Sequence, residues 1–144
     1  MSKHAHIANS ERVLEALGYW PTFHDAEVIS FLVERALPLR SGYSSARMAV
    51  HVRKYESVGE GTAQYAQVLR KSVLIRFAFS TVSELELSDF NHQNVINSIT
   101  VEQAGGNGLS SLQVTIESIW GFGGTLRCMS ASVETVEVMS NADA

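Results

Sequence analysis

The adjacent residues His24 and Asp25 are the side chains of this sequence best suited to chemistry. Metal-dependent hydrolases bind their metal through imidazole and carboxylate groups, but they need further ligands at set positions. The remaining histidines do not complete such a pattern: His4, His6, His51 and His92. The pair follows Pro21 and precedes an apolar run, so Asp25 can hydrogen-bond a backbone N–H in a turn and His24 a backbone carbonyl. We interpret the pair as a structural turn that starts a sheet, and a metal site is the alternative.

The other histidines have weaker patterns. His4 and His6 are spaced like two metal ligands on an extended strand, but they lie in an expected loose arm. A barrel enzyme that uses such a motif also needs about 200 or more residues. His51 lies between Arg47 and Arg53 on the polar face of an expected strand. We interpret that face as solvated, and a basic patch for an acidic partner is the alternative.

Cys128 is the only cysteine, so the chain forms no intramolecular disulfide and no cysteine-rich zinc site. Its alternation with Leu126 predicts a small buried side chain, and the sequence identifies no basic partner that would activate a nucleophilic thiolate. The nearby run GFGGT, at 121–125, lacks the Lys-Ser/Thr ending of a phosphate-binding loop and a following helix. That run therefore predicts a β-turn.

The composition is typical of one globular domain. The chain has 144 residues, of which 45% are hydrophobic and 18% are charged, so we expect a single domain over 1–144. The formal net charge of −4 disfavours nucleic-acid binding, because an acidic chain repels phosphate backbones. The sequence has no apolar run long enough for a membrane span and no apolar N-terminal signal. A single cysteine also suits a reducing compartment, so we expect a cytoplasmic protein that does not bind membranes.

The candidate side chains need a scaffold, and the spacing of apolar residues predicts one that is mainly β. Residues 1–8 form an expected loose arm, and 9–18 a helix with Asn9 or Ser10 as N-cap and Gly18 as its stop. From 26 to 139 apolar and polar residues alternate, which is typical of about six to seven antiparallel strands. The expected fold class is α+β, mainly β: a sandwich or partly closed barrel with an N-terminal helix packed on the sheet. Residues 140–144 form an expected frayed tail.

Three connections between the expected strands have recognisable patterns. Asn107–Gly108 predicts a hairpin turn, and 120–126 predicts another hairpin connection. The alternation shifts near Ser130–Ser132, which predicts a bulge or bend. The segment 56–72 has no clear period, and we interpret it as a loop with one short helical turn.

Two further features suit either a structural role or contact with a partner. The segment 89–96 is unusually polar for a link between strands, and its amides Asn91, Gln93 and Asn94 can satisfy turn backbone groups. We interpret it as a structural turn, and a recognition loop is the alternative. We interpret Trp120 as a core residue, with an interface position as the alternative.

Three segments, taken in order, resemble the bacterial immunity protein 50 family: WPTFHDAEV at 20–28, LIRFAFSTVSELELSDFNHQNVI at 74–96 and IWGFGGTLRCMSASVETVEV at 119–138. The likeness covers about residues 17–138, and its most specific pieces are 23–27 and 90–94. The resemblance implies a structural or partner-contact role for these positions: Trp20, Phe23, His24, Asp25, Phe90, Asn91, Gln93, Asn94, Trp120 and Gly121.

The resemblance implies a cytoplasmic antidote that is encoded beside a polymorphic toxin. Such a protein binds its cognate toxin domain and blocks it without chemistry, so the resemblance implies no catalytic residue and no cofactor. An acidic surface favours a basic toxin through electrostatic steering. The alternatives are a metal-dependent hydrolase that uses His24 and Asp25, and a small-ligand-binding β domain with an enclosed cavity of roughly 300–1,000 Å³. The sequence leaves the oligomeric state open.

Overall fold

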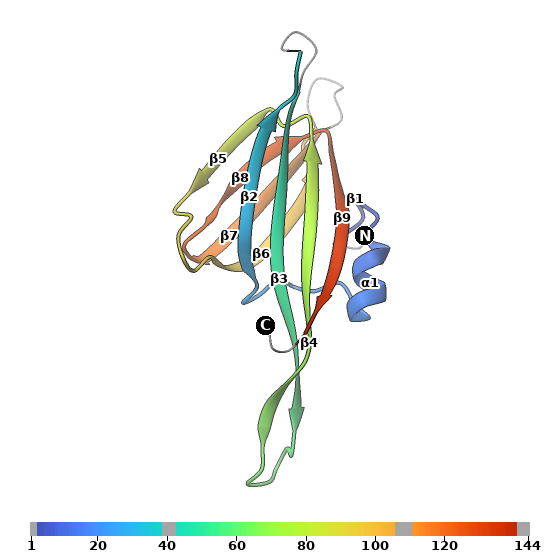
Figure 1. Ribbon diagram of the computed structural model, residues 1–144, viewed down its shortest axis with the longest axis vertical. Coiled ribbons are helices and arrows are strands. Elements are labelled where there is room, and N and C mark those ends of the chain that lie inside the picture. The colour runs from blue at the N-terminus through green and yellow to red at the C-terminus, as the bar shows by residue number, and fades with distance from the viewer. Residues whose placement is uncertain (1–2, 39–42, 106–110, 141–144) are drawn as a thin grey trace.

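A computed structural model describes residues 3–38, 43–105 and 111–140 of the chain (Figure 1). Within these ranges the chain forms one helix and nine strands, and the strands make one open sheet that is mixed but mostly antiparallel. The elements are β1 (Ile7–Ala8), α1 (Glu11–Leu17), β2 (Glu27–Arg35), β3 (Ser44–Val58), β4 (Ala66–Ser80), β5 (Glu84–Ser88), β6 (Val95–Gln103), β7 (Leu112–Trp120), β8 (Gly123–Cys128) and β9 (Ser130–Met139).

The sheet folds back on itself at one short junction. The strand order is β1-β9-β4-β3-β2-β6-β7-β8-β5, and only the β1–β9 pair is parallel. β2 and β6 share a single residue pair, Glu27 with Val95. Beyond this junction β6, β7 and β8 lie behind β2, β3 and β4 (Figure 1). We call the strands β1, β9, β4, β3 and β2 the front half, and β6, β7, β8 and β5 the back half.

The core lies between these two halves and takes side chains from both. The alternation in the sequence predicts the inward-facing residues of three strands, and the structure confirms them as buried. They are Met48, Val50 and Val52 of β3, Val73, Ile75, Phe77 and Phe79 of β4, and Leu112, Val114 and Ile116 of β7. A core shared by both halves holds the folded sheet together, although its strands meet at only one residue pair.

Helix α1 lies beside β9 at the edge of the front half (Figure 1). It buries Val13 and Leu17, and it ends at Gly18, whose left-handed φ of 87° glycine adopts most readily. Ser10 occupies the N-cap position, but its side chain makes no cap hydrogen bond, so the expected polar cap is absent. At the other end, Lys54 of β3 donates to the carbonyl of Leu17 at 3.2 Å. A cation at this end is favourable because the helix dipole is negative there.

Strand β2 differs from the expected alternation because of a β-bulge. The sequence places Ile29, Phe31 and Val33 on one face, with Val28 on the other. The pairing of β2 with β3 shifts between Val28 and Ser30, so Val28 is fully buried and Ile29 is 48% exposed. Phe31 and Val33 keep the inward direction, opposite Met48 and Ala46 of β3.

Two segments that were expected to be irregular form strands. Ile7 and Ala8, expected in a loose arm, form β1 and pair with Ala131 and Ser132 of β9. Ile7 is also buried, which explains why the arm is held against the sheet. The interpretation of 56–72 as a loop with a helical turn is wrong, since β3 and β4 continue as a long hairpin whose turn spans 59–65. This hairpin projects beyond the rest of the sheet (Figure 1).

The remaining connections agree with the sequence where the structure describes them. β7 and β8 form the expected hairpin around Gly121 and Phe122. A bend at Met129 separates β8 from β9, so the chain changes its partner from β7 to β4. Asn107–Gly108 and residues 141–144 lie outside the described residues, although β6 and β7 pair antiparallel as a hairpin requires. The count of about six to seven strands was too low, and the sheet is mixed rather than wholly antiparallel.

Candidate functional site

The buried amide of Asn94 joins three segments that the sequence analysis singled out. Asn94 is 3% exposed. Its Oδ1 atom accepts hydrogen bonds from the backbone N–H of Asn91 at 2.9 Å and of Phe122 at 3.2 Å. Its Nδ2 atom donates to the carbonyl of Asn91 at 2.8 Å and to that of Val28 at 3.2 Å. A primary amide has two donor hydrogens and two acceptor lone pairs. All four hydrogen bonds that the Asn94 side chain can make therefore hold these segments together.

The residues beside Asn94 are constrained in the same way. Gly121 has a φ of 80°, and a Cβ on it would lie 2.6 Å from the carbonyl oxygen of Gln93. Glycine is therefore required at 121 both by conformation and by space. The Oδ1 atom of Asn91 accepts from the N–H of Gln93 at 2.8 Å, and its Nδ2 atom donates to the carbonyl of Asp89 at 3.0 Å. These contacts are those of a structural turn.

The backbone of 23–26 starts β2 and attaches it to the back half. Phe23 and Asp25 both have φ near 66°. The N–H of Asp25 donates to the carbonyl of Ile96 at 3.0 Å, and the N–H of Ala26 donates to Phe23 at 3.0 Å. The ring of Phe23 is buried, with its centroid 6.0 Å from that of Phe77. The turn therefore fixes where the front half meets the back half.

The side chains of His24 and Asp25 point away from this scaffold. They are 59% and 72% exposed, and His24 Nε2 lies 3.6 Å from Asp25 Oδ2. His24 Nδ1 donates to the side-chain oxygen of Asn97 at 2.8 Å, and not to a backbone carbonyl as the sequence analysis expected. The expected side-chain bond from Asp25 to a turn N–H is not formed among the described residues either, because Asp25 faces solvent.

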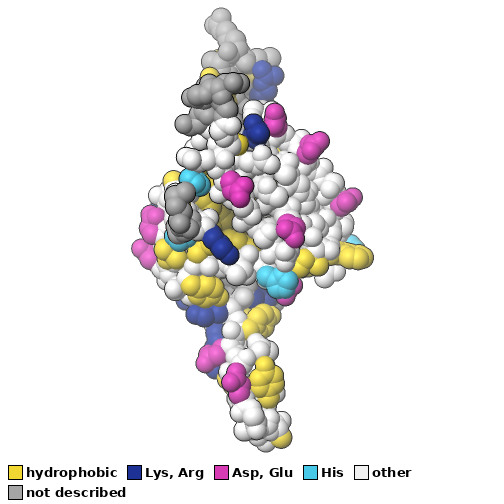
Figure 2. Space-filling model, turned by 180° about the vertical axis from the view of Figure 1, so that it is seen from behind, with side chains coloured by type: hydrophobic (Ala, Val, Ile, Leu, Met, Phe, Trp, Pro, Cys, Tyr) yellow, Lys and Arg dark blue, Asp and Glu magenta, His cyan; other side chains and the backbone are white. Residues whose placement is uncertain are grey.

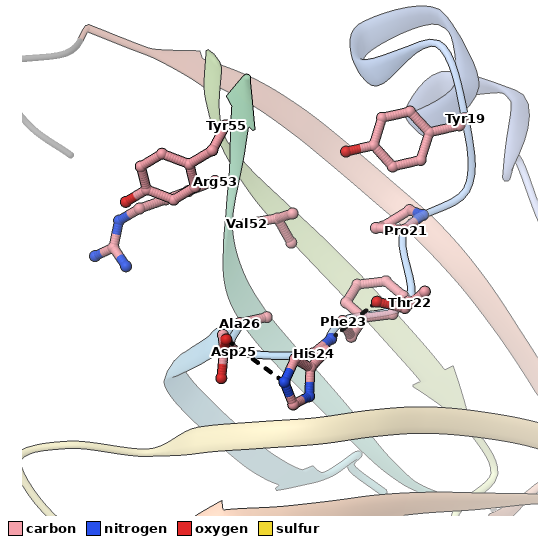
Figure 3. Close-up of a pocket in the computed structure, with 10 residues that line it drawn as sticks. All are labelled: Tyr19, Pro21, Thr22, Phe23, His24, Asp25, Ala26, Val52, Arg53 and Tyr55. Atoms are coloured by element: carbon pink, nitrogen blue, oxygen red, sulfur yellow. Dashed lines mark hydrogen bonds and ion pairs between the residues drawn. The ribbon is translucent and has the colours of Figure 1, made fainter. Parts of the chain in front are cut away.

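These two side chains line a cleft of about 390 Å³ (Figure 3). Tyr19 stands on one side of the cleft, and Arg53 and Tyr55 stand on the other (Figure 3). Tyr19 and Tyr55 are 42% and 52% exposed. Tyrosine and arginine are enriched at the centres of protein interfaces, so the composition of the cleft suits contact with another protein.

The described residues contain no cluster of side chains that could ligate a metal ion. No three His, Cys, Asp or Glu side chains there lie close enough together to hold a metal ion. His4, one of the two N-terminal histidines, instead packs its ring against Trp20, with 5.1 Å between centroids. The metal-dependent hydrolase thus lacks a three-ligand site among the described residues, with His24 and Asp25 as an isolated pair.

The interpretation of His51 as part of a solvated face is wrong. His51 is 7% exposed, and its Nε2 atom hydrogen-bonds the hydroxyl of Ser72 on the neighbouring strand. Its cross-strand partners are Glu27 of β2 and Leu74 of β4, so His51 lies on a central strand with a neighbour on each side. Burial and the nearby Arg53 lower the pKa of His51, while Glu27 opposes this shift.

Trp120 and Cys128 have opposite environments. Cys128 is buried, as its alternation with Leu126 predicts, and burial raises the pKa of its thiol to about 11. Trp120 is 61% exposed, so its interpretation as a core residue is wrong. The tryptophan that does pack on the core is Trp20, whose ring lies 5.7 Å from that of Phe23. Phe90, another motif position, is also 49% exposed.

Two residues that complete the cleft, Tyr19 and Tyr55, had no signal in the sequence, whereas Arg53 was expected on the polar face of its strand. Tyr19 follows the helix, Arg53 and Tyr55 come from β3, and the folded chain brings all three beside His24. The alternation in β3 did indicate that Arg53 faces away from Val52. No local signal indicated that this polar face meets the turn before β2, because that contact depends on how the whole sheet folds.

The fold and the site define a class: a folded-over β-sheet whose polar motifs hold its junction, and whose exposed aromatic side chains remain available to a partner. A family model described as Immunity protein 50 matches residues 9–139, and the chain belongs to this family. Searches of curated proteins and of solved structures gave no match. None of the described residues form a helix with the length and apolar character that crossing a membrane requires.

Proposed function

We propose that this chain is a non-catalytic immunity protein that neutralises a cognate bacterial toxin domain by binding it directly in the cytoplasm. The observation that carries this proposal is the family match over 9–139, which includes nearly all the described strands. Neutralisation by binding needs a stable surface and no reactive group. The buried and protonated thiol of Cys128 and the isolated His24–Asp25 pair are consistent with that requirement.

Within this function, we assign the motif positions to two roles. Asn91, Asn94 and Gly121 support the junction of the sheet, because their polar atoms and backbone are used inside the fold. Phe90 and Trp120 are 49% and 61% exposed, so they remain available to the toxin. Aromatic side chains contribute a large share of the binding energy at many protein interfaces.

The charge of the sheet supports a basic partner. The four strands of the back half carry Glu84, Glu86, Glu102 and Glu117 but only one basic residue, Arg127. Figure 2, which shows the molecule from behind, has acidic side chains spread over this side. The front half carries seven basic and five acidic residues on its strands. A basic toxin is therefore steered toward the back half, which raises its association rate.

The test is co-expression with the toxin domain encoded beside the gene for this chain. We expect rescue of growth, a purified complex of defined stoichiometry, and complete loss of toxin activity only when the two proteins are equimolar. Inhibition far below equimolar amounts would indicate turnover and would contradict a non-catalytic role. Absence of any complex with that toxin domain would contradict direct binding.

A further inference from the structure

An apolar groove opens between β2 and β5, at the side of the sheet that remains unclosed. It has a volume of about 310 Å³ and is lined mainly by Phe31 and Val33 of β2, Leu87 of β5, Phe90 and Phe122. The ring of Phe122 lies 5.4 Å from those of both Phe31 and Phe90. These three rings form a continuous aromatic surface within the groove.

Both strands beside the groove have an unpaired backbone edge among the described residues. β2 pairs with β6 only at Glu27, and the N–H of Val28 makes the next contact, to the carbonyl of Asn94. From residue 29 to 34, β2 pairs with β3 alone among the described residues. β5 likewise pairs only with β8. Unpaired N–H and C=O groups along an edge can accept one more strand.

The groove exposes apolar side chains to solvent. Val33 and Phe90, which line it, are 44% and 49% exposed. Natural sheets protect their free edges with lysine, proline and other charges, or with bulges. β2 has a bulge between Val28 and Ser30 and carries Glu34 and Arg35, but neither β2 nor β5 contains proline or lysine. Beyond the bulge, the edge of β2 is therefore only partly protected, and beside an apolar groove it has the features of a site for strand addition.

The charges around the groove define the occupant. Asp89 lines the groove, and Glu34 and Glu86 lie on the two edge strands next to Val33 and Leu87. The one basic residue of these two strands is Arg35, so acidic side chains are in excess and a segment that carries lysine or arginine is favoured here. A second copy of this chain would bring the same acidic excess, and like charges placed opposite each other across strands are unfavourable.

We propose that the toxin binds by adding an extended segment to the free edge of β2, with alternate apolar side chains in the groove and basic side chains facing Glu34, Glu86 and Asp89. This proposal rests on the proposed function, and it names the docking site and the kind of segment that fills it. Backbone hydrogen bonds to β2 supply affinity, and the groove and its acidic rim select the sequence.

The first test is amide hydrogen exchange on the wild-type chain, with and without the toxin domain encoded beside its gene. We expect binding to slow exchange in residues 29–35, with a smaller effect in 84–88. Binding that leaves both segments unchanged, and protects the cleft at 19–26 and 52–55 instead, would overturn the groove proposal and leave the proposed function standing. No binding of the toxin domain at all would overturn both the groove proposal and the proposed function.

The second test compares two glutamine substitutions on the same strand. Val33→Gln places an uncharged polar side chain in the groove, and Leu32→Gln places the same side chain on the opposite face, where Leu32 is 48% exposed. We expect Val33→Gln to weaken toxin binding by about 30-fold or more, the effect of losing one hot-spot contact. Leu32→Gln adds no charge beside Glu34 and should change the Kd by less than about threefold, a change too small for a hot-spot contact.

Equal affinities of the two variants would overturn the proposal, as would a greater loss for Leu32→Gln. Circular dichroism of both variants checks that they fold. If they do not fold, the exchange experiment on the wild-type chain tests the proposal by itself. Sedimentation of the free chain tests the competing occupant. A dimer whose formation protects 29–35 in the absence of toxin would assign the groove to a second copy and overturn the proposal.

Discussion

Replacement of Asn94 tests whether one amide holds the junction of the folded sheet. Asn94→Ala removes four hydrogen bonds. Two of the abandoned groups belong to the exposed Asn91, so water can replace the lost partner. The other two are the N–H of Phe122 and the carbonyl of Val28, whose residues are 2% and 0% exposed. Each buried group left unpaired costs about 1–3 kcal/mol, so we expect a loss of about 2–6 kcal/mol.

A loss of that size is a large part of the roughly 5–15 kcal/mol that stabilises a typical domain. Urea denaturation, followed by tryptophan fluorescence and circular dichroism together, measures the free energy of unfolding. The matched control is Asn97→Ala, because among the described residues the hydrogen bonds of the Asn97 amide go to the exposed side chains of His24 and Glu117. We expect this control to cost about 0.5 kcal/mol. If Asn94→Ala costs no more than Asn97→Ala, the hydrogen bonds of Asn94 do not hold the junction, and the reasoning fails.

Three further predictions concern single residues. Gly121→Ala should destabilise the chain by more than about 2 kcal/mol, because it combines a clash with a left-handed conformation; Gly105→Ala, with open space around it, should be nearly neutral in the same urea assay. The folded pKa of His51 lies below its ordinary value of 6.5, so stability should fall as the pH drops below 6.5, and His51→Gln should flatten this dependence. A wild-type profile no steeper than that of His51→Gln would contradict the burial of a neutral ring. The Cys128 thiol, with a pKa of about 11, should react with a thiol reagent at pH 8 only as fast as the chain opens, and stability should fall above pH 9, where an exposed thiol ionises. Rapid labelling of the native chain at pH 8 would show that the thiol is accessible.

The alternation of apolar residues predicted much of the sheet, because a strand that is buried on one face has an apolar residue at every second position. Val73, Ile75, Phe77 and Phe79 form this pattern at four successive alternate positions of β4. β1 shows no such pattern, since two residues are too few to display a period and only their pairing with β9 makes them a strand. The hairpin around 59–65 was missed because its strands leave the core, so their outer residues lack a buried face.

The candidate site was predictable in its backbone role but not in its exposed side chains. Pro21 and the turn residues that follow indicated where a sheet begins, and the amides at 91 and 94 indicated a turn that satisfies its own backbone. The exposure of Trp120 was not predictable, since it depends on which face of the β7 end another element covers. The burial of His51 depends in the same way on its neighbours across two strands.

The junction and the groove are physically connected, and this connection explains why motif residues that do not face a partner matter for binding. The carbonyl of Asn94 accepts a hydrogen bond from the N–H of Val28, and the pairing between the front half and the back half ends there. The bulge that follows directs Phe31 and Val33 inward and leaves the edge of β2 open. Asn94 and Gly121 therefore determine where the free edge begins, while Val33 and Glu86 determine what it accepts. Exchanging Val33 and Glu86 alone should therefore change which toxin is bound and leave the stability of the sheet within about 0.5–1 kcal/mol.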